Sequence, residues 1–222
     1  DQPESKSLSV PAFDLPTSSF LGAETRQAQN DYMQDLVALG QLTAESCPPM
    51  EGASVESIPA IRQQQAEVFY TSALYKKLVN RYKVIISPET IGGVYTEVFT
   101  PEEGISPQNQ QRVLINFHGG SFTSGSRTAS HQESIPIAAV GNIKVVSVDY
   151  RMGPENRFPA ASDDALAVYR ELLKDYKPEC IGVYGCSAGA MLSAQLIARL
   201  LQEKLPLPGA ISMSCWSAHD ID

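Results

Sequence analysis

A serine flanked by two glycines, between an apolar run and a helical stretch, limits the fold of this chain more than any other sequence feature. Residues 185–189 read Gly-Cys-Ser-Ala-Gly; the apolar run Ile181-Gly-Val-Tyr precedes them, and a helical stretch, Met191 to Leu201, follows. So tight a turn leaves no room for bulk beside the serine, which explains the flanking glycines. It also holds Ser187 in a strained backbone conformation beside the free N–H groups of the helix start. The pattern predicts a strand–turn–helix unit that presents a serine nucleophile.

Two further segments follow apolar runs in the same way. The first, His118-Gly-Gly-Ser-Phe, comes directly after Val113-Leu-Ile-Asn-Phe. Its glycines carry no Cβ, so main-chain N–H groups can approach a substrate carbonyl closely. The second, residues 149–164, reads Asp-Tyr-Arg-Met-Gly-Pro-Glu-Asn-Arg-Phe-Pro-Ala-Ala-Ser-Asp-Asp and follows the apolar run Ile143 to Val148. The serine motif alone could be an ordinary glycine-flanked turn, but three blocks in one order are far more specific.

These three blocks, in this order, resemble the bacterial hormone-sensitive-lipase-like family of α/β-hydrolase esterases, and the resemblance extends from about Lys83 to Trp216. It implies that Ser187 is the acyl nucleophile. It also implies an oxyanion hole made of three backbone N–H groups, those of Gly119, Gly120 and Ala188. The sequence departs from the family pattern at Ser121, which replaces the third loop glycine, and at Cys186, where the family usually has an acidic residue or threonine.

The resemblance implies a serine carboxylic-ester hydrolase that acts through an acyl-enzyme on short to medium acyl esters, with no cofactor or metal. Two alternatives keep the same scaffold. One is an amidase or thioesterase with the same machinery, and the other is a non-enzyme that binds a small molecule.

The catalytic base is the group that the sequence does not supply. In this fold the acid and then the histidine follow the serine along the chain. His118 belongs to the glycine loop, which it is expected to hold by hydrogen bonds, and His131 precedes the serine. His219 follows so closely that no acid-bearing strand fits between them. We therefore expect the acid and the base on a C-terminal fragment of the same protein, present as a second chain after nicking in an exposed loop.

Apolar and β-branched runs bounded by turn residues predict six strands. The first two alternate apolar with polar residues, as antiparallel strands do, and the last four are nearly continuous apolar runs, as buried parallel strands are. The strands are expected at residues 82–87, 93–100, 112–117, 143–149, 180–184 and 209–215. The predicted fold class is α/β: an α/β-hydrolase fold with a mostly parallel central sheet flanked by helices. Residues 81–222 would form only the N-terminal part of this catalytic domain, with the sheet incomplete and its sixth strand at an apolar edge.

Residues 1–80 are predicted to form an N-terminal segment with two helices. Apolar residues recur at helical spacing from Glu24 to Leu39, and Gly40 is expected to end that helix. After a link rich in proline, glycine and serine, a second helix is expected from about Ala60 to Asn80. The resemblance implies that these helices form part of a cap over the active site; the alternative is a pair of helices packed on the sheet as plain structure.

Several polar residues of the second block are expected to be structural. The family places them in an ion network that fixes the loop beneath the active site, and buried charges persist only when paired. They are Asp149, Arg151, Glu155, Asp163 and Asp164. Cys186 is expected to pack away from the substrate as a small apolar residue and not to act as a rival nucleophile.

Composition narrows the classes of partner. The net charge is −8, and 43% of the residues are apolar. No apolar run approaches the roughly 18 residues that a membrane-spanning helix needs. Without Lys/Arg clusters, this acidic chain is not expected to bind nucleic acid.

The four cysteines lack metal-binding spacing and favour a reducing, cytoplasmic compartment, although the start at Asp1 leaves a removed signal peptide and secretion open. The expected partner is a small-molecule ester, and a homodimer is left open.

Overall fold

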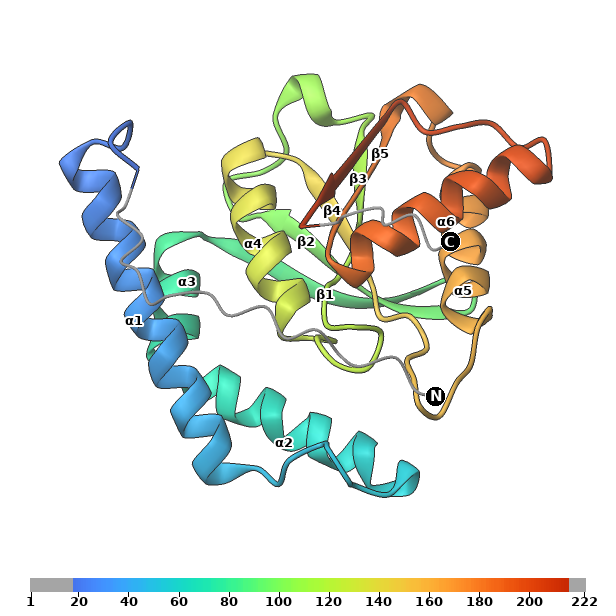
Figure 1. Ribbon diagram of the computed structural model, residues 1–222. Helices are drawn as coiled ribbons and strands as arrows, with labels where there is room; N and C mark the ends of the chain where they lie inside the picture. Colours follow the sequence, from blue (N-terminus) through green and yellow to red (C-terminus); the bar gives the residue numbers. More distant parts are fainter. Residues whose placement is uncertain (1–17, 216–222) are drawn as a thin grey trace, which may run out of the picture.

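The computed structural model describes residues 18–215, and its central element is a six-stranded sheet in the order β1-β2-β4-β3-β5-β6 (Figure 1). β2 runs antiparallel to both β1 and β4, whereas the pairs β3–β4, β3–β5 and β5–β6 are parallel. Each predicted strand is present close to its predicted bounds. The strands are β1 (Val84–Ile91), β2 (Val94–Pro101), β3 (Val113–Phe117), β4 (Lys144–Val148), β5 (Ile181–Cys186) and β6 (Ala210–Ser214).

Helices cover both faces of this sheet. The helix α4 (Ala129–Gly141) lies on one face, and α5 (Ala160–Leu172) and α6 (Ala188–Gln202) lie on the other (Figure 1). The apolar side chains accordingly form two clusters, one packed against α5 and α6 and the other against α4. Two-sided burial is why β3, β4 and β5 lack the alternation of a half-exposed strand, whereas β6 is exposed along its whole length.

The first N-terminal helix is longer than predicted. Helix α1 (Ala23–Ser46) continues through Gly40, which was expected to end it. A glycine costs only about 1 kcal/mol inside a helix, and the good helix formers that follow it continue the hydrogen-bond ladder. The helix ends at Ser46, and its C-cap Cys47 has extended backbone immediately before Pro48-Pro49. Proline lacks an N–H and disfavours helical backbone in the residue before it, so the proline pair and not the glycine stops α1.

The second predicted helix is in fact two helices. Helix α2 (Ile58–Thr71) and helix α3 (Ala73–Arg81) are separated by Ser72, whose backbone is extended, with φ −67° and ψ 156°. The Ser72 hydroxyl accepts a hydrogen bond from the Tyr75 N–H at 3.1 Å and donates one to the Phe69 carbonyl at 2.6 Å. This single side chain caps the start of α3 while it satisfies the end of α2.

The three N-terminal helices differ in how they attach to the rest of the chain. Helix α1 has no buried side chain and packs beside α2 and α3, where Lys77 forms an ion pair with Asp35 at 2.7 Å. Helix α2, in contrast, buries four apolar side chains: Ile58, Ile61, Ala66 and Phe69. The division of the chain at residue 80 and the role of these helices as a cap stay predictions.

The parallel strands bring the three sequence blocks to one edge of the sheet. Phe117 at the end of β3 is in register with Val148 of β4 and with Gly185 of β5. Parallel strands end at the same edge, so the segments that follow them meet there. The glycine loop (residues 118–128), the Asp149 loop (residues 149–159) and the serine turn (residues 185–189) are therefore neighbours, as the resemblance implies.

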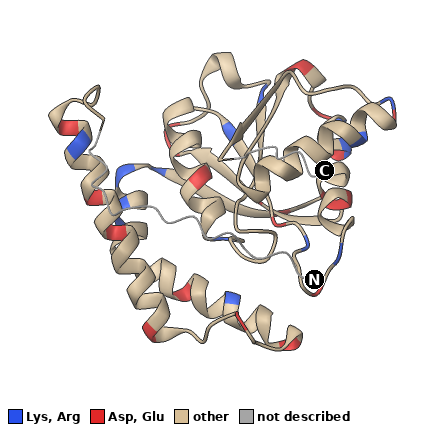
Figure 2. Ribbon diagram, viewed as in Figure 1, with Lys and Arg blue, Asp and Glu red and all other residues tan. Residues whose placement is uncertain are grey.

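Basic and acidic residues are interspersed along the described part of the chain. Figure 2 shows Lys and Arg positions scattered among acidic ones along the ribbon. Among residues 18–215, no helix combines the length and the hydropathy that crossing a membrane requires.

We predict that Ser72→Ala destabilises the protein by about 1 kcal/mol, the usual cost of losing a serine N-cap. The free energy of unfolding in urea measures it. Thr71→Ala is the matched control, because this exposed neighbour bonds only the Val68 carbonyl one turn back. An equal effect of both substitutions would contradict the capping role of Ser72.

Candidate active site

Ser187 lies in the turn between β5 and α6, in a backbone conformation that residues other than glycine rarely adopt. Its φ is 54° and its ψ is −117°, and strain of this kind costs on the order of 1–3 kcal/mol. Its N–H donates to the Ser214 carbonyl at 2.9 Å, and its carbonyl accepts from the Met191 N–H at 3.1 Å. The side chain is exposed and makes no capping bond to α6. The turn thus presents the serine at the sheet edge.

The glycines on either side of this turn are required by close packing. Neither Gly185 nor Gly189 has a positive φ. A Cβ on Gly189 would overlap the Phe117 carbonyl oxygen, and a Cβ on Gly185 would meet the same oxygen at 2.5 Å. The close approach of α6 to the end of β3, more than the turn itself, explains both glycines.

The glycine loop after β3 turns back sharply on itself. Gly120 has a φ of 118°, and its carbonyl accepts hydrogen bonds from the N–H groups of Thr123 and Ser124. A Cβ on Gly120 would overlap the Ser124 carbonyl, so glycine is required there. Ser121 and Phe122 follow with φ values of 55° and 59°. Ser121 therefore adopts, with strain, a left-handed backbone that glycine would adopt freely.

The three predicted oxyanion donors are not equivalent. The N–H of Gly119 donates to Oε1 of Glu133, on α4, at 3.0 Å and is engaged in that bond. The N–H of Gly120 has no acceptor among the residues that the structure describes. Ala188 is the first residue of α6, where N–H groups precede the helical hydrogen-bond ladder. Gly120 and Ala188 therefore have N–H groups available to a ligand, whereas that of Gly119 holds the loop to α4.

His118 holds the glycine loop from beneath, as predicted. Its ring is fully buried and stacks on Tyr150, with ring centroids 4.3 Å apart. Nδ1 lies 2.8 Å from the Gly119 carbonyl oxygen, and the Tyr150 hydroxyl donates to the His118 carbonyl at 2.8 Å. Burial lowers the pKa of His118, so the ring is neutral and its Nδ1–H donates to the carbonyl. The ring serves as a rigid support of the loop.

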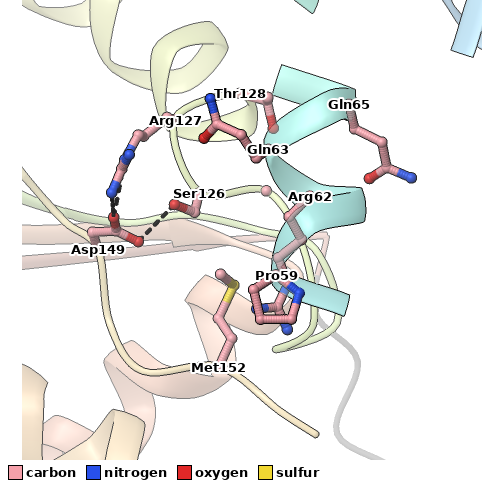
Figure 3. A pocket seen from close by; sticks show the side chains of 10 residues that line it. Pro59, Arg62, Gln63, Gln65, Ser126, Arg127, Thr128, Asp149 and Met152 are labelled. Atoms are coloured by element: carbon pink, nitrogen blue, oxygen red, sulfur yellow. Dashed lines mark hydrogen bonds and ion pairs between the residues drawn. The ribbon is translucent and has the colours of Figure 1, made fainter. Parts of the chain in front are cut away.

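The charged residues of the second block are paired as expected, but in separate ion pairs and not in one network. Asp149 accepts hydrogen bonds from the Ser126 hydroxyl at 2.6 Å and from Nη2 of Arg127 at 3.0 Å, which ties it to the glycine loop (Figure 3). Arg151 pairs with Asp164 at 2.8 Å. Asp163 differs from the prediction, because it pairs with an arginine of α6 and not with a residue of these loops.

Arg62 connects helix α2 to both loops at this edge. Its guanidinium forms an ion pair with Glu155, including a bond of 2.7 Å to Oε2, and donates to the carbonyls of Thr123 and Gly153. Beside it lies a cavity of about 220 Å³, into which Figure 3 shows Pro59 and Arg62 of α2 projecting opposite Ser126 and Asp149. Helix α2 is thus hydrogen-bonded directly to the glycine loop through Arg62.

The remaining titratable candidates have structural surroundings. His131 is buried, and its Nε2 lies 2.9 Å from Oε2 of Glu97, with Tyr70 and Phe99 against the ring. Burial raises the pKa of Cys186, which disfavours the thiolate that a cysteine nucleophile needs. His219 lies outside the described residues.

Sequence reasoning missed Glu133 and Arg62, which both act on the glycine loop. Glu133 stands among polar residues of α4, but it is the only acidic residue of that helix, and this was the one weak signal that could have been followed. Arg62 carried no comparable signal, since an arginine in an amphipathic helix is ordinarily solvated.

Comparisons with known proteins agree with this geometry. Residues 114–220 match the model of a family described as having the alpha/beta hydrolase fold. An acetyl-hydrolase of Streptomyces hygroscopicus is 35% identical over 129 residues, which cover 57% of this chain and 43% of the relative. A gibberellin receptor of Arabidopsis thaliana is 27% identical over 169 residues, 71% of this chain and 48% of the receptor. The chain spans about half the length of these relatives.

Two solved structures are also similar to this chain. The crystal structure of an esterase named E25 superposes with a TM-score of 0.72 and 25% identity over 93% of this chain and 60% of the esterase. That of EstE7, a hormone-sensitive-lipase homologue from a metagenome library, gives a TM-score of 0.55 and 27% identity over 73% of this chain and 57% of its own.

We predict that Arg62→Met destabilises the protein by roughly 2–3 kcal/mol, because it removes several charge-assisted hydrogen bonds and leaves Glu155 unpaired. The free energy of unfolding in urea is the measure, together with the rate of proteolytic cleavage in α2, which should rise. Arg157→Met is the control, since Arg157 is exposed and has no ion pair within residues 18–215. Resistance to protease equal to that of the control would argue against the attachment.

Proposed function

Because this chain has the α/β-hydrolase fold and resembles the bacterial hormone-sensitive-lipase esterases, we propose that it provides the nucleophile of a serine carboxylic-ester hydrolase. One observation carries the proposal. An exposed serine is held at φ 54° between a strand and a helix, beside a glycine loop in which the Gly120 N–H has no acceptor within residues 18–215. Strain of this kind persists only where the surrounding structure imposes it, and it is concentrated at functional sites.

The proposed reaction follows from the groups at the site. Ser187 Oγ attacks the ester carbonyl while its proton passes to an imidazole, and a tetrahedral oxyanion forms. The N–H groups of Gly120 and Ala188 are proposed to stabilise that charge, and one such donor is typically worth roughly 3 kcal/mol of barrier. The alcohol leaves with the proton, and water then releases the acid from the acyl-enzyme. The Gly119 N–H contributes indirectly, because it is committed to Glu133.

The acid and the base are proposed to come from a C-terminal segment outside the described residues, supplied as a second polypeptide. Strand β6 has a partner on one side only among the described strands, and its Ile211 and Met213 are each 41% exposed. An apolar strand edge of this kind is a place where another strand can pair. Intact mass of the purified protein tests the two-chain arrangement: two polypeptides support it, and this chain alone contradicts it. Association of two copies stays a prediction.

The substrate is proposed to be an ester with a short to medium acyl chain, on the resemblance to the esterase family. The named activities of the relatives, an acetyl-hydrolase among them, agree with a small acyl group. An amide or thioester would use the same nucleophile and donors, and the choice among them is made by assaying the three bond types with one acyl group.

We predict that Ser187→Ala lowers kcat for a p-nitrophenyl ester by at least about 10³-fold, because no other group can form the acyl-enzyme. The experiment uses the full-length protein, and a fluorophosphonate should label the wild type at Ser187 and leave the variant unlabelled. Cys186→Ala is the matched control one residue away and should keep most of the activity.

Two other outcomes carry different conclusions. Hydrolysis that survives in Ser187→Ala would disprove the assignment of the nucleophile. Absence of activity in both the wild type and the variant would favour a ligand-binding protein on the same scaffold, as the similarity to a receptor allows.

A further inference from the structure

Glu133 is a largely buried carboxylate bonded to two neutral donors. Its Oε1 accepts from the Gly119 N–H at 3.0 Å, and its Oε2 accepts from Nδ2 of Asn116 at 2.8 Å. Within residues 18–215 no lysine, arginine or histidine forms an ion pair with it. A charge without a cation is unusual in an interior, so its two hydrogen bonds need an explanation.

The donor from Asn116 is itself fixed. Asn116 on β3 is fully buried, and its Oδ1 accepts a hydrogen bond from the Ser147 hydroxyl on β4 at 2.8 Å. This bond determines which way the Asn116 amide points, so that its Nδ2–H faces Glu133. A continuous set of hydrogen bonds therefore leads from β4 through β3 and α4 to the glycine loop.

Gly119 is held by two hydrogen bonds and by one close backbone contact. Its N–H is bound by Glu133, and its carbonyl accepts from the His118 ring. A Cβ on Gly119 would lie 3.1 Å from the carbonyl oxygen of Cys186, the residue before Ser187. Glu133 therefore fixes the loop at the point where the loop touches the serine turn.

This arrangement has a cost in stability. Burial raises the pKa of Glu133, and the hydrogen bonds from Asn116 and Gly119 oppose that effect only in part. An apolar side chain of the same length would fill the site without the desolvation penalty of a carboxylate. Groups that lower stability without an evident structural gain are concentrated where function requires them.

We propose that Glu133 is a positioning residue for ester hydrolysis: by binding the Gly119 N–H, its carboxylate fixes the loop so that the next N–H, that of Gly120, stays directed at the oxyanion. The inference rests on the proposed function, since it concerns the same site. Glu133 acts through the loop and does not touch the substrate. Pre-organisation of this kind matters because a donor contributes to catalysis only if it is in place before charge develops.

Two substitutions test separately whether the loop needs a hydrogen-bond acceptor at position 133 or a negative charge there. Glu133→Met fills a similar volume but cannot accept the Gly119 N–H. Glu133→Gln keeps an oxygen for that N–H, provided that the Asn116 amide turns and donates to Ser147 instead. Gln132→Met, at the neighbouring position of α4, is the matched control. All variants are made in the full-length protein, and their Tm values show whether they fold.

We expect Glu133→Met to lower kcat about 10- to 100-fold with KM within about twofold of the wild type, a typical effect of removing a group that orients an active-site residue. Glu133→Gln should retain kcat within about threefold. A Met variant with wild-type kcat would overturn the proposal, and so would equal losses in the Met and Gln variants. The Ser187→Ala result stays independent: if it abolishes hydrolysis while Glu133→Met does not, only the role of Glu133 fails.

Hydrogen exchange keeps the proposal testable if Glu133→Met does not fold. The peptide that carries Gly119 should be protected in both the wild type and Glu133→Gln, because each supplies an acceptor. Fast exchange in the wild type would show that the bond does not hold the loop and would overturn the proposal. Slow exchange in both would support it.

The pH dependence of stability gives a further prediction. Because its pKa is raised in the folded state, Glu133 contributes most stability below the unfolded carboxyl pKa of about 4.3, and that contribution is lost as the pH rises through its folded pKa. Tyr150, Tyr184 and Cys186 face it, and burial raises the pKa of each, so all three are uncharged in that acidic range. Burial lowers the pKa of His118 in the adjoining loop. The Tm of the wild type should therefore fall relative to that of Glu133→Gln as the pH rises. A constant difference would overturn the assignment of Glu133 as a buried carboxylate that ionises.

Discussion

The contact between the first turn of α6 and the end of β3 is the constraint on which the site depends. Gly189 approaches the Phe117 carbonyl so closely that no side chain fits, and Phe117 is in register with Gly185. Ser187 lies between these two glycines, and the glycine loop begins one residue after Phe117. One backbone contact therefore sets the proposed nucleophile and the proposed oxyanion donors relative to each other, independently of any flexible side chain.

The loops at this edge are held by polar groups rather than by apolar packing. Asp149 binds the loop through Arg127, Arg62 binds it from α2, and Glu133 binds it from α4. A glycine-rich loop has little side-chain surface to bury, so hydrogen bonds are the available means of restraining it. Each of these bonds needs a partner at a defined distance, and together they define one loop conformation more sharply than apolar contacts of similar free energy.

The fold and the strained turn that carries Ser187 were predictable because their signals are local in the sequence. Continuous apolar runs gave the parallel strands, and the glycine spacing around Ser187 gave the turn. The predicted helix boundaries were wrong at Gly40 and Ser72. At Gly40 the helix-forming residues that follow outweigh the weak preference of glycine against a helix, and at Ser72 a capping side chain starts a new helix. The bond from Gly119 to Glu133 was not predictable, since the orientation of one peptide depends on packing between α4 and β3 that no sequence pattern encodes.

Among the described residues, the two halves of the proposed serine-hydrolase chemistry are separated. The groups proposed for the electrostatic half are the strained serine, the glycine loop and the helix start, and they are fixed before any substrate arrives. Such pre-organisation supplies much of the rate enhancement in acyl transfer. The proton-transfer half is absent from residues 18–215, because His118 and His131 are both buried in structural contacts. An incoming imidazole therefore needs to satisfy only one geometric condition, hydrogen-bond distance to an exposed hydroxyl whose position is already set. A base from a separate segment can therefore bind at a rigid site more readily than at a mobile one, because it does not have to order the serine or the N–H donors.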